Sequence, residues 1–362
     1  MIYIGSLKYS PVYKSHCCAF GKACEKEGYA IKYLFSREYE WMLPKEIKEK
    51  TLFVGRSTSI PEVLLDTLNV RNSRTISKNI LRDKPTHVYL QNYHLLNHYV
   101  SRLCHRIGSK FVYHVHEPFV VDKSAHGGLA RYWLYLDEWM ESRLLEETDI
   151  AIVSSKEASR LFDSHYPEFE GKKLEIPLIY EDLGNNILSR DERKYITFVG
   201  PVMPSKGPEV FLRIVDYSNK HDLGYSFLLL SRSKVNDPDY YNRANLTVRF
   251  GKRISDEEYG EFMGKSLVVL IPYKRITQSS VLLVSYMYGT PVVSTDVGGL
   301  PEFVVPGKTG YVLQTNSSAL EWIECISLLT ENLEEVSKYC RKFFIDDFSG
   351  RAWKRYLAEM LE

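Results

Sequence analysis

A lysine and a glycine, Lys206 and Gly207, stand between an apolar run that ends at Gly200 and a helix-like segment. The first turn of a helix presents unpaired backbone N–H groups and the positive end of the helix dipole. A lysine there adds a positive point charge, so the segment FVGPVMPSKGPEVFL predicts an anion-binding turn suited to phosphate. The alternative is that Lys206 is a solvated residue of an ordinary loop.

A second segment with the same chemistry covers residues 272–313. Cations, an amide and hydroxyls lie just ahead of an apolar helix-like run: Lys274, Arg275, Gln278, Ser279 and Ser280. First-turn amides and hydroxyls of that helix could hold phosphate oxygens. Capping of the helix by Ser279 or Thr277 would need no ligand, but it leaves the two cations unexplained.

Other phosphate and metal motifs are missing. The chain lacks the Gly-x4-Gly-Lys-Ser/Thr loop, and no Gly-x-Gly-x-x-Gly follows its first strand-like run. The six cysteines, at 17, 18, 24, 104, 325 and 340, have neither zinc-site spacing nor the density of a disulfide scaffold. We therefore expect reduced, mostly buried thiols and no metal site, and the nucleotide-triphosphatase and dehydrogenase classes lose their main support.

The elements that must position these residues form two similar series. In residues 1–175, the strand-like runs IYIGSL, YAIKYLFS, THVYLQ, KFVYHVHE and DIAIVSS alternate with helix-like segments. In residues 194–335 the runs are KYITFVG, YSFLLLS, LTVRFG, SLVVLIPY and TPVVSTD. Such alternation predicts α/β domains with doubly wound parallel sheets, in which ligands collect at the carboxyl ends of the strands. Two such sheets would face a central cleft.

Two further segments complete the predicted organisation. Residues 176–193 are rich in polar and turn residues and read as an interdomain connector. Residues 336–362 are helical in pattern and could cross back to the N-terminal domain. We expect the amphipathic C-terminal end to pack through Phe343, Phe344, Trp353, Tyr356 and Leu357.

Composition agrees with this organisation. The chain has 362 residues, of which 44% are hydrophobic, so two domains with sizeable cores are expected. Lys and Arg number 47 against 46 Asp and Glu, so no overall field favours nucleic acid. No apolar run approaches the ~20 residues of a membrane span. Met1 leads directly into a strand-like run without a leader-like segment. These features predict a cytoplasmic protein.

Contact with the inner face of a membrane stays open. Arg102, Arg106 and Lys110 lie on one helix-like face, which could approach anionic lipid or could simply be solvated.

The second half resembles the nucleotide-binding domain of the retaining glycosyltransferase family 4, which has the two-Rossmann-domain fold called GT-B. The strings FVGPVMPSKG, LVVLIPY and GTPVVSTDVGGLPEFVVPGKTGYVL carry the resemblance. The first half matches more loosely, through VHE and DIAIVSS. The resemblance implies transfer of a sugar from a nucleoside diphosphate sugar to a glycan, glycolipid or other hydroxyl acceptor, with retention and without a metal or other cofactor.

The same resemblance suggests roles for individual residues. It places Lys206 on the donor diphosphate, with Gly200 and Gly207 in its turn, and the amides around Ser279 and Ser280 on the other side of that diphosphate. It makes His116 the first-domain residue that touches the transferred sugar. The sequence without the resemblance favours a strand-end histidine bonded to backbone at His116, and His114 on the same strand face competes with it.

Departures from the family pattern are equally specific. The family often has two glutamates eight positions apart, where this chain has Ile276 and Val284. It resembles a branch with Gln-Ser-Gly in place of the glutamate pattern. Pro201 replaces a common arginine, which leaves Arg275, Lys274 or Arg253 to supply the second positive charge. Glu302 is an available carboxylate, or a capping or surface residue.

The loop after the first strand-like run has no Gly-Gly pair. Lys14, Ser15 and His16 could therefore contact an acceptor through their side chains.

Three functions fit the sequence. The first is a glycosyltransferase that uses a UDP- or GDP-sugar and a glycan or lipid-linked acceptor. The second is a catalytically silent nucleotide-sugar-binding or partner subunit, suggested by Ile276, Val284 and Pro201. The third is a GT-B nucleotide-sugar epimerase.

Overall fold

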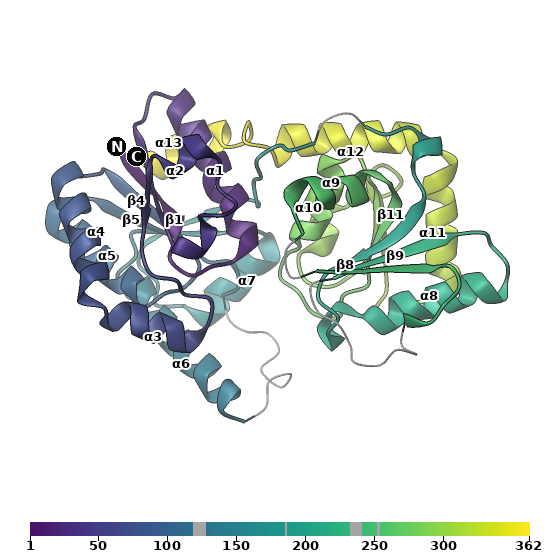
Figure 1. Cartoon of the computed structure of the whole chain (residues 1–362), viewed down its shortest axis with the longest axis horizontal. Coiled ribbons are helices and arrows are strands. Elements are labelled where there is room, and N and C mark those ends of the chain that lie inside the picture. Colours follow the sequence, from purple (N-terminus) through teal and green to yellow (C-terminus); the bar gives the residue numbers. More distant parts are fainter. Residues whose placement is uncertain (119–127, 185–186, 232–240, 252–253) are drawn as a thin grey trace. The chain divides into compact units, whose positions relative to one another are not determined.

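The computed structural model describes residues 1–118, 128–184, 187–231, 241–251 and 254–362. The chain divides into two compact units, Met1–Glu181 with Ser349–Glu362, and Asp182–Phe348. Both ends of the chain therefore belong to unit 1 (Figure 1). The division at residues 181 and 182 lies within the segment predicted as a connector.

Unit 1 is built on a parallel sheet whose seven described strands have the order β3-β2-β1-β4-β5-β6-β7. The strands are β1 (Ile2–Ser6), β2 (Ile31–Phe35), β3 (Thr51–Phe53), β4 (His87–Gln91), β5 (Lys110–His114), β6 (Ile150–Val153) and β7 (Lys172–Glu175). The helices are α1 (Pro11–Lys26), α2 (Lys45–Lys48), α3 (Ile60–Leu68), α4 (Val70–Asp83), α5 (Leu96–Ile107), α6 (Leu129–Glu146), α7 (Lys156–His165) and α13 (Lys354–Leu361).

Both faces of this sheet are covered. Along β5, Val112 packs with α1 and α13, whereas Phe111 and Tyr113 pack with the helices of the opposite face. This alternation is the two-residue period of a strand, and the apolar residues on both faces produce the continuous apolar runs of the sequence. Trp353, the N-cap residue of the returning helix α13, packs against Phe20 and Tyr89. This contact attaches the end of the chain to the core of unit 1.

Unit 2 repeats the plan with six described parallel strands in the order β10-β9-β8-β11-β12-β13. The strands are β8 (Tyr195–Val199), β9 (Ser226–Ser231), β10 (Leu246–Phe250), β11 (Ser266–Ile271), β12 (Val292–Thr295) and β13 (Gly310–Leu313). The helices are α8 (Pro208–Lys220), α9 (Asp256–Gly264), α10 (Ser280–Met287), α11 (Ala319–Glu331) and α12 (Leu333–Asp347). The α/β fold of two doubly wound parallel sheets is thus confirmed.

Three strands go beyond the sequence prediction, and all three lie at sheet edges: β3, β7 and β13. Their residues are mostly only partly buried, so these strands lack the long apolar runs of the central strands. The C-terminal segment also differs from one continuous helical element. Phe344 of α12 is buried in unit 2, whereas Trp353 and Leu357 belong to the core of unit 1.

Candidate functional site

The two predicted phosphate turns of unit 2 lie at the switch point of its sheet. They follow β8 and β11, which are hydrogen-bonded neighbours, while the chain proceeds outward from them in opposite directions. Parallel α/β sheets bind ligands at this position, outside the carboxyl ends of the strands. The tertiary structure therefore brings together two segments about 70 residues apart in sequence.

Glycine allows the two turns to touch. Gly207 has a φ of +63°, and a Cβ atom there would lie 1.9 Å from the carbonyl oxygen of Pro272. The backbone N–H of Lys274 donates to the carbonyl oxygen of Ser205 across the same contact, at 2.9 Å. Gly200, with a φ of +135°, begins the first turn directly after β8. The turns are thus joined through their backbones.

Lys206 lies over the ring of Tyr273, with its ammonium nitrogen 3.9 Å from the ring centroid. The Tyr273 hydroxyl donates to the carbonyl oxygen of Val199 at 3.3 Å and is also hydrogen-bonded to Ser279. Burial raises the pKa of Tyr273 well above neutral pH, so the ring stays uncharged beneath the lysine. The half-buried ammonium group is held by a cation–π contact at the junction of the turns.

Ser279 and Ser280 begin α10. Ser279 occupies the N-cap position, but its side chain makes no capping hydrogen bond and instead bonds Tyr273. Capping by Ser279, one of the two sequence interpretations, is therefore absent. The first turn of α10 therefore directly follows a residue that bonds Tyr273, the ring beneath Lys206.

A third turn joins this junction and was missed by sequence reasoning. Gly298 has a φ of +58°, and a Cβ atom there would lie 1.6 Å from the carbonyl oxygen of Ile276. The Gly299 N–H donates to the carbonyl oxygen of Thr277 at 3.0 Å. The glycine pair in DVGGLPE was the available signal, because close backbone approach favours glycine.

The remaining predicted donor residues differ in exposure. Arg275 is exposed and Gln278 is half-buried, both in the turn after β11. Lys274 forms an ion pair with Glu209 at the start of α8. Arg253 lies outside the described residues. Glu302 is exposed on a short 3-10 helix, Leu300–Phe303.

In unit 1, His116 and His114 occupy different environments at the end of β5. His114 is 2% exposed, and both of its ring nitrogens are bonded, to the Tyr89 hydroxyl at 2.7 Å and the Ser154 hydroxyl at 2.6 Å. His116 is half-buried, stacks on His114 with a centroid distance of 4.3 Å, and contacts the Tyr13 ring at 4.3 Å. His114 is thus committed to internal bonds.

The donor and the acceptor can be assigned in each hydrogen bond that links His116 to His114. His116 Nε2 donates to Gln91 Oε1 at 3.2 Å, since a carbonyl oxygen only accepts. The Gln91 amide donates to the Tyr89 hydroxyl at 2.7 Å, and that hydroxyl is left to donate to His114 Nδ1. Burial keeps the pKa of both histidines well below neutral pH. The chain of bonds therefore orients a neutral His116.

Ser15 and His16, predicted on the acceptor side, hold the end of unit 1. His16 Nδ1 donates to the carbonyl oxygen of Ile179 at 2.7 Å, and Ser15 Oγ accepts from the Glu181 N–H at 3.0 Å. Burial lowers the pKa of His16 to about 4. Lys14 is also buried, at 6% exposure. These bonds attach residues 179–181 to α1, and the acceptor role of all three residues stays a prediction.

A carboxyl group on the other face of β5 was also missed. Glu141 of α6 accepts from the Tyr113 hydroxyl at 2.5 Å, and burial raises the pKa of Glu141 to about 8. Nearby on α6, Asp137 lies 3.8 Å from the Lys8 ammonium group. The position of Glu141 within α6 gave no signal in the sequence.

The described residues also bear on metal binding and on membrane-spanning helices. Among them, no three or more His, Cys, Asp or Glu side chains are grouped so that they could hold a metal ion. Within the described ranges, no helix has the length and apolar character to cross a membrane. The cysteines of the described structure form no disulfide, and all but Cys325 are buried, as predicted.

The fold places the chain in a known class. Over 99% of this chain and 97% of the other, it superposes on sucrose-phosphate synthase from Thermosynechococcus elongatus with a TM-score of 0.70 and 15% identity. Anabaena HepE in complex with UDP-glucose gives a TM-score of 0.66 at 12% identity, with 100% and 99% of the two chains covered. Two Rossmann-like units of this kind define the GT-B fold.

Sequence comparison shows what part of the chain is similar to known glycosyltransferases. Residues 193–332 match the family model described as glycosyl transferases group 1. The D-inositol 3-phosphate glycosyltransferase of Corynebacterium efficiens is 25% identical over 218 residues, 54% of this chain and 51% of that protein. An uncharacterized glycosyltransferase of Methanocaldococcus jannaschii is 26% identical over 44% of this chain and 48% of that protein. The chain spans about half the length of the curated relatives it matches.

Residues 193–332 therefore match a group 1 glycosyltransferase domain, and the relatives and the GT-B fold support a family 4-like glycosyltransferase. The assignment of the chain to the Gln-Ser-Gly branch stays a prediction.

Proposed function

We propose that the protein transfers a sugar from a nucleoside diphosphate sugar to a hydroxyl group of a glycan or glycolipid, with retention and without a metal ion. The observation that carries the proposal is the junction in unit 2, where two turns are linked through their backbones, Lys206 lies over Tyr273, and Ser279 at the start of α10 bonds the same tyrosine. HepE is described in complex with UDP-glucose, and the pneumococcal GtfA with UDP and GlcNAc, which favours a UDP-sugar over a GDP-sugar.

In this proposal Lys206 and the amides around Ser279 and Ser280 bind the diphosphate, with Gly200 and Gly207 shaping the turn. Arg275 and Gln278 supply further contacts to the donor, and Arg253 is a candidate for the same task. The sugar–phosphate bond breaks through an oxocarbenium-like state, and the main task is to stabilise the charge on the departing diphosphate. A lysine about 4 Å from a phosphate charge contributes roughly 4 kcal/mol before desolvation, at an effective dielectric constant near 20.

His116 is proposed to contact the transferred sugar as a neutral hydrogen-bonding group. Its Nε2 proton is directed to Gln91, so its Nδ1 edge is the one suited to accept from a sugar hydroxyl. The acceptor oxygen attacks from the face that the diphosphate leaves, and the acceptor proton passes to the departing phosphate oxygen. This route needs no carboxylate nucleophile, which is consistent with Ile276 and Val284 in the glutamate positions.

A binding and turnover panel tests the proposal. The full chain is screened by thermal shift against UDP-, GDP- and ADP-sugars, since a ligand at a hundredfold excess over its dissociation constant stabilises by about 2.7 kcal/mol. The bound donor is then incubated with and without hydroxyl acceptors, and products are identified by mass spectrometry. Absence of binding to every nucleoside diphosphate sugar would contradict the proposal.

The silent-subunit alternative rests on Ile276, Val284 and Pro201. It predicts donor binding without transfer to any acceptor and without slow donor hydrolysis. The epimerase alternative predicts an isomerised or released sugar when no acceptor is present.

A further inference from the structure

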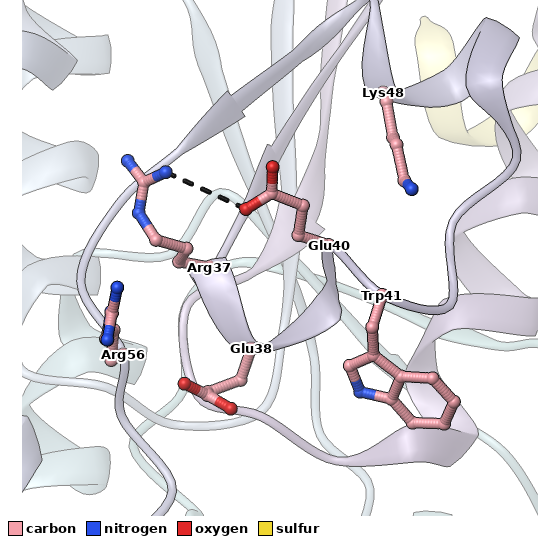
Figure 2. A pocket seen from close by; sticks show the side chains of 6 residues that line it. All are labelled: Arg37, Glu38, Glu40, Trp41, Lys48 and Arg56. Atoms are coloured by element: carbon pink, nitrogen blue, oxygen red, sulfur yellow. Dashed lines mark ion pairs between the residues drawn. The ribbon is translucent and has the colours of Figure 1, made fainter.

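A cationic pocket of about 390 Å³ opens in unit 1 beside strands β2 and β3, away from the histidines. Figure 2 shows its six lining side chains: Arg37, Glu38, Glu40, Trp41, Lys48 and Arg56. Arg37 follows the carboxyl end of β2, and Arg56 follows that of β3. The pocket thus lies at the same edge of the sheet as His116, where ligands of parallel sheets collect.

The backbone that carries the two arginines is held firmly. The Arg37 N–H donates to the carbonyl oxygen of Gly55 at 3.1 Å, which joins the two turns directly. The Arg56 N–H donates to the Asp66 carboxylate at 2.8 Å. Tyr39, which is fully buried, donates its hydroxyl to backbone oxygens near Ser10. A preorganised frame of this kind lowers the cost of ordering a binding site.

The charges of the pocket suit an anion. Three cations face two carboxylates, and one cation, Arg37, lies 3.8 Å from Glu40. Among the described residues, the side chains of Lys48 and Arg56 have no ion-pair partner. A planar guanidinium group matches a carboxylate or phosphate through two parallel hydrogen bonds.

Trp41 adds a flat apolar surface. Its side chain is 44% exposed and is the one apolar member of the lining. An aromatic face beside a few charged groups suits a sugar ring that carries an acidic substituent. A lipid headgroup site would need further apolar residues to enter the membrane, and this lining has none.

The distance to His116 restricts what the pocket can hold. Three strand spacings separate β2 from β5 in the sheet, and at about 4.8 Å each this amounts to roughly 14 Å. One sugar residue cannot reach from the pocket to His116. The ligand in the pocket must therefore be a distal part of a longer acceptor.

We propose that this pocket binds a carboxylate- or phosphate-bearing sugar residue of an oligosaccharide acceptor, at least one residue away from the hydroxyl that receives the transferred sugar. The role of the ligand as an acceptor rests on the transferase function proposed above. Binding of the anionic sugar to the pocket does not require the donor. Arg37 and Arg56 hold the anionic group, and Trp41 stacks on the ring.

Titration calorimetry of the full chain at low salt, without donor, tests this. The probes are trigalacturonate and the uncharged galactotriose. We expect trigalacturonate to bind at least ten times more tightly, and Arg37→Gln with Arg56→Gln to remove that difference. Arg106→Gln, an exposed arginine at the far end of α5, is the matched control and should leave both affinities unchanged. Trp41→Ala should weaken the binding of both probes, while the conservative Trp41→Phe should retain it.

Equal affinity for the two probes, or an unchanged preference in the double variant, overturns the proposal. So does binding to phosphatidylglycerol vesicles that depends on Arg37 and Arg56 while trigalacturonate does not bind, which would assign the pocket to a lipid headgroup. UDP binding is measured on the native protein and on the same variants. If the native protein does not bind UDP, the transferase function is contradicted, whereas the result on sugar binding in this pocket still holds.

Discussion

The candidate residues of unit 2 and unit 1 are held in different ways. In unit 2, three turns, two of which contain glycine, approach one another through backbone contacts, and Lys206 lies over Tyr273 at this junction. In unit 1, His116 is oriented by a relay of side chains from β4 and β5. Backbone turns leave a local sequence signature, and a relay does not. The family model accordingly matches residues 193–332, all of which lie in unit 2.

The largest expected effect is on the rate of transfer, and it tests whether the junction of turns in unit 2 binds a charged ligand. Lys206→Gln should lower kcat/KM for transfer at least 100-fold, because the diphosphate loses its nearest ammonium group. The effect is measured in steady-state kinetics with the donor found in the binding panel. Lys220→Gln, an exposed lysine at the end of the adjoining α8, is the control and should change little. Equal kinetics in the two variants would remove Lys206 from the donor site.

The free energy of unfolding should depend on pH through a buried histidine of unit 1. His16 has a pKa of about 4 in the folded protein against an ordinary value of 6.5, so the unfolded chain takes up the proton first as the pH falls. Stability is therefore lost between pH 6.5 and 4, by up to about 3 kcal/mol for this residue. His16→Asn keeps a donor for Ile179 and does not titrate. Urea unfolding at pH 7 and 4.5 should show a shallower pH dependence in this variant, and an identical slope would contradict the assignment.

The contact between the turns of unit 2 can be separated from backbone strain. Gly207→Ala places a Cβ against Pro272, whereas Gly224→Ala adds one at a similar φ of +72° with nothing within 4 Å. Left-handed strain alone costs roughly 1–2 kcal/mol, so Gly224→Ala measures that part. We expect Gly207→Ala to cost about 2 kcal/mol more in thermal unfolding and to weaken UDP binding. Equal losses would mean that the close approach matters little.

The smallest effect concerns the relay of unit 1. Tyr89→Phe leaves His114 Nδ1 without its donor and should cost about 1–2 kcal/mol in urea unfolding. Tyr33→Phe is matched to it, because the Tyr33 hydroxyl is buried in the same core and has no hydrogen-bond partner among the described residues. That control should leave stability unchanged or slightly raise it. Equal losses from the two variants would show that the relay contributes nothing.

Some residues of the two sites could be predicted from the sequence and others could not. Lys206, Gly207, Ser279 and Ser280 were accessible because strand-to-helix turns have characteristic residues at fixed offsets. Tyr273 and Gln91 were not, because each acts through a contact with a segment distant in sequence. Ser279 illustrates the limit, since its position before α10 predicts a cap and its actual bond goes to Tyr273.

The sequence by itself determined the two α/β units, their central strands and the resemblance to a glycosyltransferase family, because buried parallel strands and glycine turns follow from local residue types. It could not show the short edge strands, and it left the return of the C-terminal segment to unit 1 as one possibility, since both depend on packing rather than on a local pattern. The choice between His114 and His116 also needed the tertiary structure. Both histidines suit the end of a strand, and only their partners show that His114 is bonded at both nitrogens while His116 stays half-buried.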